Sequence, residues 1–330
     1  MSLKDYRNEL KNALLDLAWS QWTALGVAGH TKEYSAQVID LESLILFTLF
    51  IGQYDQRLFD SMLDWLQNNG RFVNTQRLIS LHKKNEQKNA NILSYVAANL
   101  TAFECRLKWH KLAKRPSSTA ETKPLFKDIP SISKQARDEI ALQYGLERNP
   151  YKFLGKQTAF NKSNIATLQL KLRGFFGVNS RAEVILILLS KDYCKNQDIA
   201  NSTGFSWKSI QDILFEMTYS GIVSATQSKK SRLYHLSNIE KWNSIFGISE
   251  INHLKFPTWS DIFFSLEQLY ETLENPKLDK VSALSVMGVV EKVFQQIGSV
   301  FLQCGIGSLR EANTTNYLNI PSMINTMITK

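Results

Sequence analysis

Apolar residues recur at steps of three and four positions through most of the first third of the chain, which is the period of an amphipathic helix. Polar residues that favour helix N-termini, such as Asp40, and glycines that favour helix ends, such as Gly26 and Gly70, divide this pattern into segments. The sequence therefore predicts a block of five helices, which cover residues 10–22, 41–52, 56–69, 75–84 and 87–110.

Two of these helices, 56–69 and 75–84, permit a helix-turn-helix. Gly70 lies between them, and Lys83 and Lys84 fall on the predicted surface of the second helix. A plain helical bundle that packs against the rest of the chain explains the same pattern, so both interpretations stand at this point.

Residues 180–237 carry a different pattern. Three short helices are expected, the first with Ser180 as N-cap, the second starting at Asn196 and ending at Gly204, and the third with Ser206 as N-cap. In the third helix one face is apolar, and the opposite face leaves polar residues for solvent or a partner.

Two short β-like runs then follow, 222–226 and 232–236, on either side of the polar turn 227–231. Three helices followed by a basic hairpin is the order of a winged helix-turn-helix. In that fold the start of the third helix reaches base edges, and basic residues of the hairpin reach phosphate.

Residues 172–184, LRGFFGVNSRAEV, followed by this helix-turn-helix and the strand Tyr234-His235-Leu236, resemble the winged-helix transcriptional regulators of bacteria in the broad ArsR/MarR-like sense. They are especially similar to a poorly characterised family of two-part proteins that carry such a domain in their second half. The resemblance implies a DNA-binding fold and a homodimer, since many helix-turn-helix proteins dimerise to bind two half-sites. It implies no effector ligand and no operator sequence.

The expected fold class is therefore mainly α, with a winged helix-turn-helix of three helices and a hairpin between other helices. Additional helices are expected at 133–146, 164–176, 238–246 and 259–273, and a longer one from Asp279 whose broad apolar stripe (281–302) needs two packing partners. The chain divides into a helical segment (1–112), a basic connector (113–162), the winged helix (163–246) and a helical tail (247–330).

The net charge of the chain indicates the kind of partner that it binds. The chain of 330 residues has a net charge of +9, which favours an anionic partner, and nucleic acid in particular. Residues 108–162 hold twelve basic and five acidic residues, so this segment either extends a phosphate-contacting surface or is a solvated linker. Residues 240–292 hold eight acidic and five basic residues, which favours dimerisation or packing on the first segment over contact with DNA.

The sequence carries none of the common motifs for catalysis, nucleotide binding or metal binding. There is no GxxxxGK[ST] loop, GxGxxG, HExxH or CxxC motif, and the five histidines lack metal-ligand spacing. No cofactor, metal or enzymatic activity is therefore expected. Cys194 is either a redox sensor or a packing residue.

Three widely spaced cysteines argue against a disulfide framework and favour the reducing cytoplasm. The longest apolar run, 44–51, is too short to cross a bilayer, so no membrane partner is expected.

Duplex DNA is the expected partner, and the sequence identifies no effector. The candidate DNA-binding residues lie at the start of the third helix (Trp207, Lys208, Ser209 and Gln211) and in the hairpin (Lys229, Lys230 and Arg232). Trp207 has a second interpretation, which is packing against Phe205. Two other functions remain open: a protein-interaction module or antitoxin-like partner that uses the same fold, and an enzyme with an unfamiliar helical site.

Overall fold

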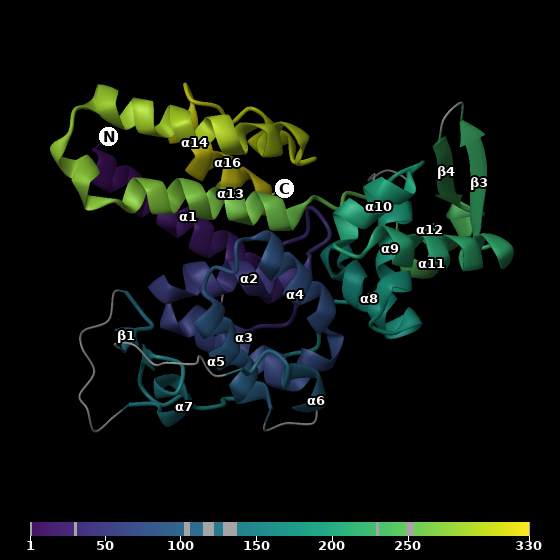
Figure 1. Ribbon diagram of the computed structural model, residues 1–330, viewed down its shortest axis with the longest axis horizontal. Coiled ribbons are helices and arrows are strands. Elements are labelled where there is room, and N and C mark those ends of the chain that lie inside the picture. Colours follow the sequence, from purple (N-terminus) through teal and green to yellow (C-terminus); the bar gives the residue numbers. More distant parts are fainter. Residues whose placement is uncertain are drawn as a thin grey trace.

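The computed structural model describes residues 2–29, 32–101, 106–114, 122–127, 137–228, 231–248 and 254–329. These residues form sixteen α-helices, several short 3-10 turns and two small two-stranded sheets. The expectation of a mainly helical fold is confirmed. The helices gather into a larger group, here called the helical body, and a smaller one that carries a β-hairpin (Figure 1).

The helical body is built from both ends of the chain. Its first part contains α1 (Leu3–Ala24), α2 (Leu41–Ile51), α3 (Gln56–Asn69), α4 (Thr75–Lys84), α5 (Ala90–Leu100), α6 (Arg106–Trp109) and α7 (Glu139–Leu142), with the parallel strands β1 (Lys123–Pro124) and β2 (Leu146–Glu147). Its second part contains α13 (Trp259–Glu274), α14 (Ala283–Gln303), α15 (Gly307–Arg310) and α16 (Ile320–Thr329). The 3-10 turns are η1 (Gly52–Tyr54), η2 (Gly70–Phe72), η4 (Ile165–Thr167), η5 (Pro276–Lys280) and η6 (Tyr317–Asn319).

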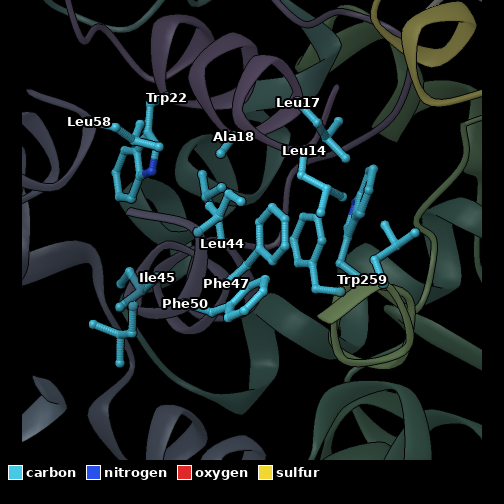
Figure 2. Close-up of a cluster of buried hydrophobic side chains, with 14 of the residues drawn as sticks. Leu14, Leu17, Ala18, Trp22, Leu44, Ile45, Phe47, Phe50, Leu58 and Trp259 are labelled. Carbon is cyan, nitrogen blue, oxygen red and sulfur yellow. The ribbon is translucent and has the colours of Figure 1, made fainter. Parts of the chain in front are cut away.

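Helix α2 lies at the centre of the body. It begins at the predicted cap, since the Asp40 carboxylate accepts a hydrogen bond from the backbone N–H of Ser43. Nearly every side chain that follows is buried, as expected for a helix that is apolar all round. Figure 2 shows Leu14 and Trp22 of α1 meeting the α2 side chains in this core.

The C-terminal helices complete the same core. The ring of Phe47 in α2 stacks on Phe263 of α13 at 4.3 Å between centroids, and the Tyr6 hydroxyl of α1 donates to the carbonyl of Tyr317. Helix α16 runs along α1, and α14 lies on α13 at the upper edge of the view (Figure 1). The tail therefore packs on the first segment of the chain, which is one of the two arrangements that its charge suggested.

The smaller group, here called the hairpin unit, has a second core of its own. It contains α8 (Leu168–Phe176), α9 (Ser180–Ser190), α10 (Asn196–Thr203), α11 (Trp207–Tyr219), β3 (Val223–Ser228), β4 (Ser231–Leu236) and α12 (Ile239–Phe246). The two strands pair antiparallel from Val223↔Leu236 to Ser228↔Ser231. The predicted turn 227–231 was therefore too long, because the ladder of hydrogen-bonded pairs continues through both of its ends.

Three other local predictions were wrong. The helix expected at 133–146 is reduced, within the described part of that range, to the single turn α7, because Gly145 has a left-handed backbone (φ +71°) and Leu146 belongs to β2. The helix expected from 87 begins at Ala90, since Gln87 also has a positive φ. The N-cap of α9 is Asn179 instead of Ser180.

The basic connector lies on the helical body. Leu154 N–H donates to the Asp64 carboxylate of α3 at 3.1 Å, and Thr158 N–H donates to the carbonyl of Gly26 at 2.8 Å. Strand β1 and helix α7 lie at the end of the body that is far from the hairpin (Figure 1). The described part of the connector therefore does not extend the surface of the hairpin unit.

Candidate nucleic-acid interface

The start of α11 is set by local chemistry. Gly204 ends α10 in the left-handed conformation (φ +75°), and two residues later the hydroxyl of Ser206 caps α11 by accepting from Ser209 N–H at 3.2 Å. Helices α10 and α11 are thus joined by a turn of three residues. The side chains of Ile210, Ile213, Leu214 and Met217 are buried in the unit, which directs the opposite face of α11 to solvent.

Most of the predicted residues of α11 lie on this outer face. Lys208 and Gln211 are exposed, and neither side chain makes a hydrogen bond or ion pair with any residue that the structure describes. Trp207 is 47% exposed, so it is not a core residue, although it lies beside Phe205 on the wall of a groove. Ser209 is half-buried, and its backbone N–H is used by the cap.

The hairpin projects from the unit on the side away from the helical body (Figure 1). Arg232 pairs with Gln227 across the ladder, is exposed, and holds its guanidinium 5.5 Å from the ring centre of Tyr234. Lys229 and Lys230, the other two candidates, lie outside the described residues. Lys208, Gln211 and Arg232 are thus the polar candidates with exposed side chains among the described residues, and Trp207 is exposed beside them.

A groove of about 480 Å³ separates the start of α11 from the body. Trp207 and Phe205 line one wall, and Lys84 and Asp261 line the other, joined by an ion pair of 2.5 Å. Lys84 was one of the basic residues expected on the surface of α4. The same helix directs Ser80 to the carbonyl of Gly204 at 2.9 Å, so the turn between α10 and α11 rests on α4.

The second half of the outer face of α11 has a different character. Phe215 and Tyr219 are 69% and 89% exposed, and Asp212 and Glu216 lie beside them. Glu216 forms an ion pair with Arg181 of α9. Sequence analysis missed these two aromatic residues, although their position outside the buried stripe of α11 was a signal that could have identified them.

The unit is joined to the body by a buried ionic network. Its members are Asp40 and Glu42 of α2, Arg77 of α4, Arg173 of α8 and Glu183 of α9, and all are at most 3% exposed. Arg173 donates to both oxygens of Glu42 at 2.7 Å and contacts Glu183 at 2.6 Å, whereas Arg77 contacts Asp40 and Glu42 at 2.6 Å.

The network also positions the turn before α11. The Nε–H of Arg77 donates to the backbone carbonyl of Thr203, the last residue of α10, at 2.7 Å. Burial alone would raise the pKa of Glu42, but the charges of Arg173 and Arg77 outweigh burial and lower it. Glu42 is thus held as a carboxylate that bridges the body to the unit.

Two further features bear on reactive chemistry in the part of the chain that the structure describes: Cys194 and the search for metal ligands. Burial raises the pKa of Cys194 to about 11, and this cysteine is buried and lies in a backbone bridge to Tyr234, which favours the packing interpretation over that of a redox sensor. Among the described residues, no three His, Cys, Asp or Glu side chains converge as metal ligands would. None of the helices in the described ranges has the length and apolarity needed to span a bilayer.

Comparison with known proteins adds no family: no family model, no curated protein and no solved structure matches this chain. The features of the chain that bear on its function are therefore the geometry of α11, the hairpin and the network that connects the unit to the body.

Proposed function

We propose that the chain binds duplex DNA and regulates transcription through a winged helix-turn-helix, in which α10 and α11 form the helix-turn-helix and β3 with β4 forms the wing. The observation that carries the proposal is the outer face of the start of α11, where Lys208 and Gln211 project into solvent after a three-residue turn. In helix-turn-helix proteins this end of the second helix enters the major groove.

The side chains suit the two kinds of contact that such binding needs. Lys208 and Gln211 can hydrogen-bond to base edges, and the N-terminus of α11 favours a nearby phosphate through its helix dipole. Arg232 on the hairpin supplies a phosphate contact. Asp212 and Glu216 require the second half of α11 to turn away from the DNA backbone, as happens when only the first turns enter the groove.

The test is fluorescence anisotropy of the full chain with duplex DNA from its own upstream region, measured across a salt series. Lys208→Ala and Arg232→Ala are each expected to weaken binding and, where the lost contact is to phosphate, to reduce the slope of log K against log salt by about 1. Lys152→Ala is the matched control, because it removes the same charge from the body. If wild-type protein holds no duplex at low salt, DNA binding is refuted.

A second function, docking of a protein partner on α11, is favoured by one observation. Phe215 and Tyr219 lie four residues apart and are the most exposed aromatic side chains of the hairpin unit. Such pairs are typical of helix surfaces that bind proteins. The variant Phe215→Ala/Tyr219→Ala separates the two functions, because it leaves DNA binding unchanged if only the start of α11 touches DNA.

A further inference from the structure

The outer face of α14 carries a row of five exposed residues and one half-buried glycine with a regular spacing. Its six positions are separated by steps of four and three residues and lie within about 40° of one line along the helix, given 100° per residue. The row consists of Leu284, Gly288, Glu291, Gln295, Gly298 and Leu302. Leu284 is 79% exposed and Leu302 is 60% exposed, whereas the inner face of the helix packs on α13.

Neither glycine in this row is required by a close contact with the part of the chain that the structure describes. A Cβ added at Gly288 would have no heavy atom within 4 Å, and one at Gly298 would meet only the ring of Phe294 at 3.9 Å. Glycine weakens the interior of a helix relative to alanine, because it is more flexible in the unfolded chain. Close approach of another helix from outside would give both glycines a purpose.

The order of residues identifies that other helix. The row is symmetric about position 293, so that in the reverse direction leucine again meets leucine, glycine meets glycine, and Glu291 exchanges with Gln295. A contact between identical chains about a twofold axis requires this self-complementarity, since residue i meets residue j and j meets i. The 4-3 spacing is also that of the seam in a coiled coil.

We propose that a second copy of this chain packs its α14 antiparallel on this row, with the twofold axis beside the row at the level of position 293. Leu284 then lies against Leu302 of the second copy, Gly288 against Gly298 of the second copy, and Glu291 against Gln295 of the second copy. The two leucine layers lie at the ends of the contact, and the glycines allow the backbones to approach between them.

Polar groups and shape agree with this register. The pairing brings the Glu291 carboxylate to the Gln295 amide of the second copy on both sides of the axis. A groove of about 360 Å³ runs beside the row and is lined by Phe294, Gly298 and Leu302 among others. Leu284 of the second copy enters this groove as a knob enters a hole.

The dimer rests on α14 and not on DNA binding, so its failure and the failure of the proposed function are distinguishable. Helix α14 lies at the edge of the body, away from the hairpin unit (Figure 1). The contact therefore leaves the outer face of α11 open in both copies.

Cysteine cross-linking of the full chain under a mild oxidant tests the register. The double variant Leu284→Cys/Leu302→Cys is expected to form a covalent dimer, because the two positions meet across the axis. Neither single variant cross-links, since equal positions lie about 27 Å apart in the antiparallel pair and a disulfide needs Cα atoms within about 7 Å. Wild-type protein under the same oxidant controls for its three native cysteines. Cross-linking of a single variant, or none by the double variant, overturns the proposal.

The mass in solution tests the contact without a cross-link. Wild-type protein is expected at twice the chain mass of 37.7 kDa by light scattering, and Gly288→Leu at the monomer mass, because its side chain fills the space between the helices. The matched control Gln296→Leu adds a similar side chain on the exposed surface of α14 outside the row and leaves the dimer intact. A monomeric wild type, or an unchanged dimer in Gly288→Leu, refutes the α14 interface.

Discussion

The first turns of α2 and α11 are both capped by a polar side chain, but the charged residue in the first turn is buried and paired in α2 and exposed in α11. Glu42, in the first turn of α2, is fully buried and shared by two arginines. Lys208, in the first turn of α11, lies in solvent without a protein partner among the described residues. A charge that is buried and paired fixes two parts of the chain together, whereas an exposed unpaired charge remains available to a ligand.

The same contrast separates the roles of the body and the hairpin unit. The network of Asp40, Glu42, Arg77, Arg173 and Glu183 joins the unit to the body through buried ion pairs, and Arg77 extends this connection to the end of α10. Buried networks of this kind contribute little net stability over apolar residues of similar size, but loss of one member is costly. Here the network connects the body to the end of α10, directly before the turn that leads to α11.

The largest expected effect is that of Arg173→Met. Removal of this guanidinium leaves Glu42 and Glu183 without their shared partner in a fully buried site, so the free energy of unfolding is expected to fall by about 3–5 kcal/mol. Urea denaturation measures the loss. Arg181→Met is the matched control, because its ion pair with Glu216 is about half exposed and contributes less than about 1 kcal/mol. Equal losses in the two variants would contradict the role of the network.

A smaller change, and a gain in the free energy of unfolding instead of a loss, is expected when Glu267 of α13 is replaced. Burial raises its pKa to about 7, and its Oε1 lies 3.8 Å from Lys88 Nζ with no hydrogen-bond partner in the described ranges. The folded protein therefore binds a proton that the unfolded chain releases near pH 4.5, so stability falls as pH rises between these values.

Glu267→Gln removes this dependence, because an amide mimics the protonated acid. The variant is expected to gain about 1–2 kcal/mol at pH 8 and almost nothing at pH 5, as measured by urea denaturation at the two pH values. Glu240→Gln, which makes the same replacement at an exposed side chain of α12 in the hairpin unit, serves as the control and should show no such difference. A gain that is equal at both pH values would argue against a raised pKa.

Local signals in the sequence placed the helices well. Asp40 and Ser206 were predicted to cap their helices because their side chains can accept from the first turn, and each does so in the structure. The prediction of a helix at 133–146 was wrong because pairing with a distant strand outweighs the local helical pattern at the end of this segment. Leu146 pairs with Lys123 in a strand, and no pattern within the segment indicates it.

The ionic network could not be predicted for the same reason. Glu42 and Arg173 are 131 residues apart, and periodicity gives no information on which distant helices meet. One local signal was present: a glutamate in the otherwise apolar run of α2 is buried with its neighbours and must find a partner. The exposed positions of α11 were easier to predict than the ionic network, since the buried stripe of a helix also defines its outer face.

The smallest expected effect compares two glycines with the same backbone conformation. Gly204 (φ +75°) lies where the unit rests on α4, and Gly221 (φ +73°) lies in open space after α11. Replacement by alanine puts a Cβ into the left-handed conformation in both cases, which costs about 1 kcal/mol or slightly more.

At Gly204 the new Cβ would lie 3.4 Å from the Leu81 side chain, which is ordinary van der Waals contact, so no additional penalty is expected. Thermal unfolding of Gly204→Ala and Gly221→Ala should therefore give losses of unfolding free energy that agree within about 0.5 kcal/mol. A much larger loss of unfolding free energy in Gly204→Ala would mean that the new Cβ clashes with the Leu81 side chain, which cannot move aside. No loss at either position would mean that neither turn needs the left-handed conformation.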